Sequence, residues 1–178
     1  FKADRLMAAP RDMPGRQKND GHESAYEMLK RLELSRKTHR TIFDYCQKKK
    51  ILFLSTPFDE DSADFLDELG VKAFKIASGE LTHTRFLTHV ARKGKPMIVS
   101  TGMGTLKEVE LAVQTIYDTG NRQLVLLHCV SNYPAKPKEA NLRAIQTLAQ
   151  TFAVPVGFSD HTPGTDVSIA AVALGANV

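Results

Sequence analysis

The sequence of 178 residues contains no tryptophan and only two cysteines, and it has no apolar run of the roughly 18 residues that a membrane span requires. Cys46 and Cys129 offer neither the spacing of a zinc module nor a disulfide framework. The first residues also lack the charged and apolar regions of a signal peptide. These absences exclude a transmembrane helix and a disulfide-stapled secreted fold within the sequence. They predict a protein of the reducing cytoplasm.

Neither sign of charge dominates the sequence, because 24 basic and 20 acidic side chains leave a net charge of only +4. Many basic residues fall in the first fifty positions, without the interleaved aromatic residues of single-stranded nucleic-acid sites. We interpret them as solvated helix faces and as a helix C-terminus, where cations suit the helix dipole. The balance fits a mildly positive site for an anionic metabolite, and we expect no nucleic-acid partner and no membrane partner.

The sequence does contain a regular alternation of short apolar runs and amphipathic helical patterns. This alternation is typical of βαβ units around a parallel sheet. The apolar runs, expected as strands, cover residues 51–54, 74–77, 96–99, 124–129 and 154–158. The helices expected between and after them cover residues 59–69, 84–92, 105–117, 141–152 and 165–174, the last with Val167, Ile169, Ala170 and Val172 turned inward.

The first fifty residues are organised differently. Residues 1–22 combine proline, glycine and scattered charges without a sustained period, so we expect a long loop there. Ser24 is a suitable N-cap for a helix that continues through Leu32, and a second helix is expected from about Ser35 to Lys49.

Each of the five apolar runs ends in polar side chains of catalytic type, which favours a barrel over an open sheet. In an open doubly wound sheet only the strands beside the switch point present their ends to one ligand, whereas in a (β/α)8 barrel all of them ring one site. A barrel needs eight units and about 250 residues. Five to six βα units are visible here, and a new strand starts near residues 175–178. We therefore expect an α/β fold in which residues 1–178 are the incomplete central portion of a single TIM-barrel domain.

The polar clusters contain a natural set of phosphate ligands: Lys75, Ser78, Ser100 and Ser159. A lysine supplies a point charge and hydroxyl groups supply hydrogen-bond donors. Any one of these serines taken alone is better explained as a turn or cap residue. Lys75 lies inside an apolar strand, where an unpartnered ammonium is costly, so a functional role is the better interpretation.

Further candidates follow the same strand ends. Glu80 is placed to act as a general acid or base or to orient a hydroxyl group, the alternative being an acidic residue at a helix N-terminus. Asp160 and His161 offer a base or a metal ligand, although one histidine is no metal site by itself. Tyr133, in a Ser-Asn-Tyr-Pro corner, is either a substrate contact or loop packing. His128 and Cys129 are expected in the core.

Five motifs in fixed order give the sequence a specific resemblance. They are Ser-Thr-Pro-Phe at 55–58, Lys-Ile-Ala-Ser-Gly-Glu at 75–80, Ser-Thr-Gly-Met at 100–103, Ser-Asn-Tyr-Pro at 131–134 and Gly-Phe-Ser-Asp-His-Thr at 157–162. With them the chain resembles the sialic acid synthase (N-acetylneuraminate synthase) family over essentially its whole length. The resemblance implies a phosphoenolpyruvate-condensing (β/α)8 barrel, followed in that family by a small antifreeze-like domain that this sequence does not contain.

The resemblance also implies roles for individual residues. Lys75, Ser78, Ser100 and Ser159 would bind the phosphate and carboxylate end of phosphoenolpyruvate, and Asp160 would join the substrate-binding set. The acyl-amino sugar would contact Glu80 and Tyr133, with Thr56 nearby. His161 would be one of two histidines that hold a divalent metal, Mn²⁺ or Mg²⁺. The product would be a sialic acid or a related nonulosonate for surface polysaccharides, made by a homodimer.

The sequence departs from the family pattern in ways that keep alternatives open. Ser131 occupies the family's acyl-sugar contact two residues before the tyrosine and would join the substrate-binding set, but the family often has asparagine there, so the identity of the sugar stays open. The second metal histidine is expected just beyond Val178. Within enzymes, the alternative is an aldoheptulosonate- or octulosonate-phosphate synthase. Outside enzymes, it is a non-catalytic sugar-binding member of the same fold.

Overall fold

The computed structural model describes residues 1–6 and 24–178, and they form two compact units. The first unit takes in Phe1–Phe53 and Pro57–Gly70, the second Leu54–Thr56 and Val71–Val178. The predicted N-terminal loop lies mostly outside the described residues. Within its described part, Ala3–Leu6 form the short helix α1, so the loop prediction is wrong there.

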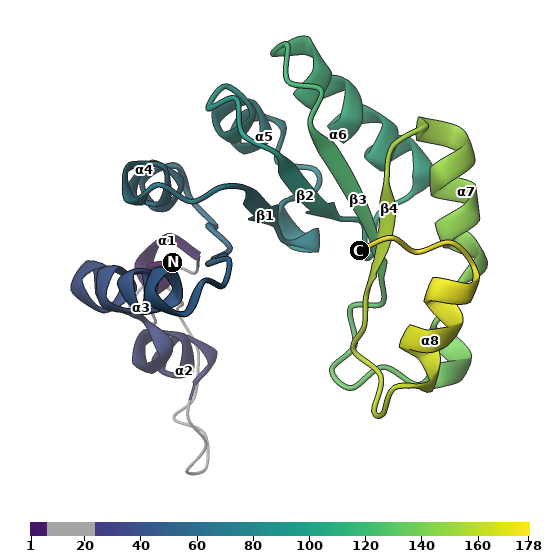
Figure 1. Ribbon diagram of the computed structural model, residues 1–178, viewed down its shortest axis with the longest axis horizontal. Helices are drawn as coiled ribbons and strands as arrows, with labels where there is room; N and C mark the ends of the chain where they lie inside the picture. Colours follow the sequence, from purple (N-terminus) through teal and green to yellow (C-terminus); the bar gives the residue numbers. More distant parts are fainter. Residues whose placement is uncertain (7–23) are drawn as a thin grey trace, which may run out of the picture. The chain divides into compact units, whose positions relative to one another are not determined.

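Helices make up the first unit. As predicted, α2 spans Ala25–Leu32 and α3 spans Arg36–Lys49, and α4 follows at Glu60–Leu69 (Figure 1). Each begins at a side chain that accepts a backbone N–H of the first turn, namely Ser24, Ser35 and Asp59. The caps therefore fix the helix starts that the sequence pattern indicates.

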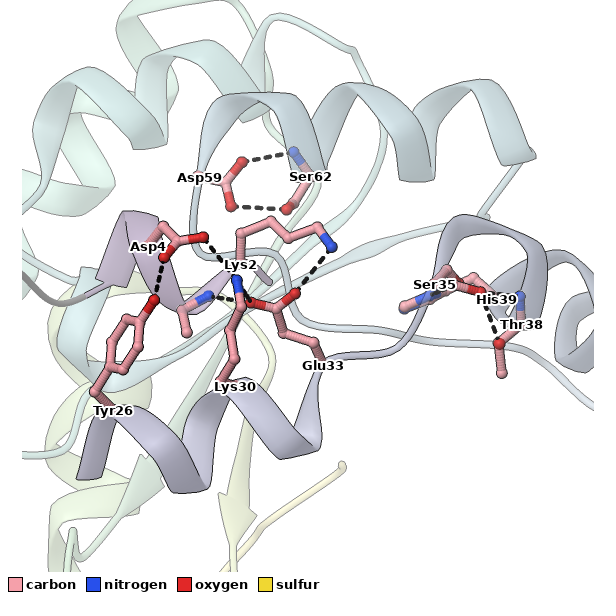
Figure 2. A network of polar contacts seen from close by, with 11 residues as sticks. Lys2, Asp4, Tyr26, Lys30, Glu33, Ser35, Thr38, His39, Asp59 and Ser62 are labelled. Carbon is pink, nitrogen blue, oxygen red and sulfur yellow. Dashed lines mark hydrogen bonds and ion pairs between the residues drawn. The ribbon is translucent and has the colours of Figure 1, made fainter. Parts of the chain in front are cut away.

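A network of charged side chains joins α1 to α2 (Figure 2). The Glu33 carboxylate accepts the Ala3 N–H at 2.8 Å and the Lys2 ammonium at 2.9 Å. These bonds, the backbone one first, lower the pKa of Glu33 to about 2. Asp4 accepts hydrogen bonds from Lys30 and Tyr26 in the same network.

One predicted strand is absent. Residues 51–54 form no strand, and Ile51 and Leu52 are more than half exposed at 57% and 61%. No other segment among the described residues pairs with this run. An apolar run becomes a strand only where a neighbour supplies a ladder of hydrogen bonds.

The other four predicted strands form a parallel sheet. They are β1 (Phe74–Ile76), β2 (Met97–Ser100), β3 (Leu124–Cys129) and β4 (Val156–Ser159), in the order β1-β2-β3-β4. All three pairings are parallel. Each strand thus lies beside the next one in the chain, as in a barrel, and the order shows no reversal of the kind that defines a doubly wound sheet.

Helices of the second unit alternate with these strands along the chain (Figure 1). They are α5 (Thr84–Ala91), α6 (Leu106–Asp118), α7 (Arg143–Phe152) and α8 (Asp166–Ala173). Helix α7 packs on β3 and β4, α8 packs on β4, and α5 packs on α6. None of the described helices is long and apolar enough to cross a bilayer.

Helix α8 corrects one prediction about side-chain direction. Ile169 and Val172, expected inward, are 66% and 67% exposed, and Ala170 is exposed too. Apolar residues surround this helix on every side, so its pattern defines no single inner face, and Ala171 is the one that is buried.

Alternation along the strands divides the sheet into two faces. Phe74, Ile76, Met97, Val99 and Leu126 are almost completely buried on the face that the helices cover. Lys75, Ser100, Cys129 and Ser159 therefore point to the opposite face, here called the inner face. The second face carries the polar candidates, as expected of the interior of a barrel near its catalytic end.

The last residues of the chain add to the ladder of β4. The Asn177 N–H donates to the Val156 carbonyl at 2.9 Å, and the Phe158 N–H donates to the Val178 carbonyl at 2.8 Å. This pattern agrees with the prediction of a further strand near residues 175–178.

Candidate functional site

The inner face holds a cluster of five residues from three successive strands and their loops: Lys75, Ser78, Ser100, Gly102 and Cys129. We call it the inner cluster. The Lys75 ammonium donates to the Ser100 hydroxyl at 2.7 Å and to the Ile76 carbonyl at 2.9 Å. Ser100 is only 3% exposed. The inner cluster thus contains three of the four predicted phosphate ligands, and two of them, Lys75 and Ser100, are in direct contact.

Burial has an electrostatic consequence for Lys75. Loss of hydration lowers the pKa of its ammonium below the usual lysine value, and the field of the neighbouring Cys129 offsets only part of that shift. The contacts made by its ammonium are oxygens of neutral groups, and an anion brought to this face would stabilise the charged form.

Ser78 and the loop after β2 form the second part of the inner cluster. The Ser78 hydroxyl accepts the Gly102 N–H at 3.0 Å and lies 3.1 Å from the Cys129 thiol. A Cβ atom at Gly102 would stand 2.6 Å from the Ser131 Oγ and 2.8 Å from both the Ser78 Oγ and the Cys129 Sγ. Glycine is therefore required for the loops after three strands to approach one another.

Ser159 and His161 stand at the end of β4. The His161 Nε2 lies 3.4 Å from the Ser159 Oγ, while the Nδ1 faces the Val130 carbonyl. Since a carbonyl only accepts, Nδ1 carries a proton, and in the neutral ring this tautomer leaves the lone pair on Nε2. The Tyr133 ring stacks on this imidazole with centroids 4.0 Å apart. Tyr133 itself is 79% exposed.

Asp160 takes a different place from its neighbours. Its carboxylate accepts the N–H and the hydroxyl of Thr162, both at 2.7 Å, and the hydroxyl of Ser168 in α8. Partial burial opposes its charged form, but the bonds from Ser168 and Thr162 outweigh that effect, so the pKa of Asp160 lies below its usual value. These bonds tie the His161 loop to α8.

Glu80 and Thr56 lie apart from the inner cluster in their contacts. Glu80 ends the short 3-10 helix η2 (Ser78–Glu80), and its carboxylate meets the His83 ring, with 2.9 Å between Oε2 and Nδ1. Thr56 is half-buried in the segment before α4, which has no regular secondary structure at that residue. No contact found among the described residues joins either of them to another predicted site residue.

The structure adds residues that the sequence interpretation did not place in the site. Cys129 is buried, as predicted, yet its thiol lies on the inner face between Ser78 and Gly102. In the structure Cys129 pairs with Ser159, and partners in register share a face. His128 is only half-buried, which corrects its assignment to the core. It helps to line a cavity of 420 Å³ between α6 and α7.

A metal centre is not complete within the described residues, where no three histidine, cysteine, aspartate or glutamate side chains converge. His161 nevertheless has the arrangement of a typical metal-ligating histidine, with one ring nitrogen bound to a backbone carbonyl and the other held only by a 3.4 Å contact with the Ser159 hydroxyl. It fits a divalent ion as one ligand of several.

Comparison with known proteins agrees with this geometry. The NeuB family model matches residues 1–178. The N,N'-diacetyllegionaminic acid synthase of Legionella pneumophila is 50% identical over 100% of this chain and 52% of its own length. The crystal structure of an N-acetylneuraminic acid (sialic acid) synthetase from Leptospira borgpetersenii, in complex with citrate, superposes with a TM-score of 0.87 at 34% identity, covering 98% of this chain and 57% of that one.

A truncated 3-deoxy-D-arabino-heptulosonate 7-phosphate synthase from Thermotoga maritima superposes with a TM-score of 0.69 over 81% of this chain and 58% of that one. At 21% identity it supports the barrel fold alone. The chain spans about half the length of the curated relatives it matches. The family match confirms the resemblance seen in the five motifs: the chain belongs to the NeuB family.

Proposed function

We propose that this chain is part of a synthase that condenses phosphoenolpyruvate with an acyl-amino sugar to give a nonulosonate and phosphate. The observation that carries the proposal is the Lys75–Ser100 pair on the inner face, joined at 2.7 Å. A half-buried ammonium next to a buried hydroxyl suits a small anion, and the neighbouring Ser78 hydroxyl extends the set. Ser159, the last residue of β4, completes the four proposed ligands of phosphoenolpyruvate.

In this proposal the sugar binds at the loops beyond the strand ends. Tyr133 and Ser131 follow β3, Glu80 follows β1, Thr56 precedes α4 and Asp160 follows β4. Glu80 is proposed as the general acid or base because its carboxylate lies two residues beyond Ser78. Asp160 acts here through the His161 loop, because Thr162 and Ser168 already occupy its oxygens.

The condensation forms one carbon–carbon bond and one carbon–oxygen bond from water, and it breaks the bond between the enol carbon and the phosphate oxygen. The enol CH2 carbon attacks the aldehyde carbon of the open-chain sugar, and the aldehyde oxygen takes up a proton. Water adds to the other enol carbon, its two protons pass to the aldehyde oxygen and to the departing phosphate, and that carbon becomes a ketone as inorganic phosphate leaves. Lys75, Ser78 and Ser100 hold the phosphate end throughout, and Glu80 moves a proton on the sugar side.

A divalent ion, Mn²⁺ or Mg²⁺, is proposed as cofactor, with the His161 Nε2 as one ligand and the second histidine in the chain beyond Val178. When bound, such an ion polarises the aldehyde oxygen. Val130 and Tyr133 orient the His161 ring for this role. The homodimer and the antifreeze-like second domain of the family also stay predictions of the family resemblance, and the cytoplasmic location stays a prediction from the scarcity of cysteine.

The name of the relative at 50% identity sharpens the choice of sugar. Phosphoenolpyruvate contains no nitrogen, so both acetamido groups of an N,N'-diacetyl product must come from the sugar. We therefore propose a sugar with two acetamido groups, and N-acetylmannosamine as the poorer substrate.

The test measures phosphate release by the full-length protein. Phosphoenolpyruvate is supplied with a diacetamido hexose, with N-acetylmannosamine or with a phosphorylated aldose, each with Mn²⁺ and with a chelator. We expect phosphate release to depend on the metal and to be fastest with the diacetamido sugar. Release with a phosphorylated aldose alone would identify the heptulosonate or octulosonate type instead, and release with none would leave a sugar-binding protein.

A further inference from the structure

We propose that His83 is a positioning residue that holds the Glu80 carboxylate in place for the sugar. This inference rests on the proposed function. His83 lies outside the family motif at 75–80, and its contact with Glu80 is what links it to the proposed site.

The local chain fold brings the two side chains together. After η2, the Leu81 N–H donates to the Ser78 carbonyl and the His83 N–H donates to the Glu80 carbonyl, both at 3.1 Å. Leu81 is 2% exposed and anchors this turn in the core. His83 is the N-cap residue of α5, yet its side chain does not cap the helix. The ring is directed at the Glu80 carboxylate instead.

The His83 ring is supported on its other side. It packs on the Phe86 ring with centroids 5.7 Å apart and planes tilted by 32°. Phe86 is fully buried, so it gives the ring a fixed surface to lie on. The imidazole therefore reaches Glu80 from a rigid base, although its side chain is 53% exposed.

The contact has a defined chemistry. A carboxylate oxygen only accepts, so the His83 Nδ1, which lies 2.9 Å from the Glu80 Oε2, carries the proton of this hydrogen bond. Both the neutral ring in this tautomer and the imidazolium keep that proton, so the bond survives a change in ring charge. The bond uses Oε2 and fixes the plane of the carboxylate, which leaves Oε1 to meet a sugar hydroxyl.

The burial of Glu80 makes this contact different from an ordinary surface ion pair, which contributes little to stability. The Glu80 side chain is only 15% exposed. It also stands two residues from Ser78, whose hydroxyl accepts the Gly102 N–H in the inner cluster. The turn that carries Glu80 is thus fixed to the proposed phosphoenolpyruvate site at one end and to His83 at the other.

The experiment compares His83→Phe with His83→Asn in the full-length enzyme. Phenylalanine keeps the packing on Phe86 and loses the donor, whereas asparagine restores a donor near the place of Nδ1. We expect His83→Phe to lower kcat/KM for the sugar about tenfold, as the loss of one hydrogen bond to a charged group implies. The KM for phosphoenolpyruvate and the melting temperature should stay unchanged, and His83→Asn should recover most of the activity.

A double-mutant cycle with Glu80→Ala keeps the test independent of folding effects. Without the carboxylate, His83→Phe should have no further effect. Additive losses, equal losses in His83→Phe and His83→Asn, or an unchanged kcat/KM in His83→Phe would each overturn the inference. A wild-type enzyme that releases no phosphate with any sugar would instead overturn the proposed function.

Discussion

The inner cluster and the loop residues that follow the same strands are held in different ways. In the inner cluster, Ser100 and Cys129 are 3% and 6% exposed, and the contacts run between strands and loops far apart in the sequence. On the loops, Tyr133 is 79% exposed, and Glu80 is held by a neighbour three residues away. Buried contacts between strands fix the inner cluster, whereas Glu80 depends on a neighbour in its own turn and Tyr133 on an exposed stacking contact with His161.

This difference matches the two proposed substrates. Phosphoenolpyruvate is the same molecule whichever sugar is used, so its ligands are suited to a rigid strand framework. The sugar is the substrate that varies, and loops accommodate variation at little cost to the fold. Substitutions in the inner cluster should therefore act on phosphoenolpyruvate, and substitutions on the loops should act on the sugar and on turnover.

The largest effect is expected from Glu80→Gln, on the loop side. Glutamine keeps the shape and accepts a hydrogen bond from His83, but it does not transfer a proton. Turnover should fall by roughly 10²–10⁴-fold, the usual contribution of a general acid or base. Steady-state kinetics should show the KM for phosphoenolpyruvate unchanged. Weak phosphoenolpyruvate binding with normal turnover would move Glu80 to the inner side and break the comparison.

Gly102→Ala should have the next largest effect, now within the inner cluster. The new methyl group would stand 2.6–2.8 Å from Ser131, Cys129 and Ser78, so at least one of these side chains must shift. Such overpacking costs about 1–3 kcal/mol of folding free energy. Displacement of Ser78 should lower kcat/KM for phosphoenolpyruvate on the order of 100-fold.

Gly79→Ala is the matched control for Gly102→Ala, because nothing lies within 4 Å of a Cβ atom built there. Kinetics and thermal unfolding of both variants separate a local clash from a general effect of adding a methyl group near Ser78. Equal behaviour of the two variants would contradict the close approach at Gly102.

The same contrast explains which features were predictable. The apolar periodicity of the sequence predicts strands β1 to β4 and the helices between them, because each of these elements depends on residues close in sequence or on an apolar face that repeats along it. Residues 51–54 carry an equally apolar run, but a strand also needs a hydrogen-bonded partner, which no periodicity reports. The prediction of an inward face for α8 was wrong for a related reason. Apolar residues on all sides of the helix leave it undetermined which side packs inward.

Site residues follow the same rule. Lys75 stands out in the sequence because an ammonium inside an apolar strand is costly. Cys129 does not stand out, since a buried thiol is ordinary, and only its distance to Ser78 shows that it lies in the cluster. His83 was missed because its role depends on one ring orientation three residues from Glu80.

Lys75→Ala tests the charge of the inner cluster. Loss of a charge-assisted bond of about 1.5–3 kcal/mol should raise the KM for phosphoenolpyruvate or lower turnover by roughly 10- to 100-fold. The exposed Lys72, three residues earlier, is the control, and Lys72→Ala should leave both parameters unchanged. An unaltered rate at low phosphoenolpyruvate in Lys75→Ala would remove the phosphate assignment.

The pH dependence of phosphoenolpyruvate binding sharpens the same point. Burial lowers the pKa of Lys75, so the free protein loses this charge at a lower pH than an ordinary lysine would. Affinity for phosphoenolpyruvate should therefore decline as the pH rises toward the pKa of a free lysine. In Lys75→Arg the alkaline decline should disappear, since arginine keeps its charge. An identical decline in both proteins would assign it to another group.

The smallest effect is expected where the two regions meet, at Ser131. Its hydroxyl packs closely on Gly102, while its loop leads on to Tyr133. An asparagine there has no room toward Gly102 and must turn to the sugar side. Ser131→Asn should therefore change the ratio of kcat/KM between N-acetylmannosamine and a diacetamido sugar, by no more than about tenfold for one altered polar contact. The adjacent Asn132, which is exposed and donates to Glu139, provides the control variant Asn132→Ser. If Ser131→Asn raised the KM for phosphoenolpyruvate and left the sugar ratio unchanged, Ser131 would belong to the inner cluster, and the boundary between the two regions would lie beyond it.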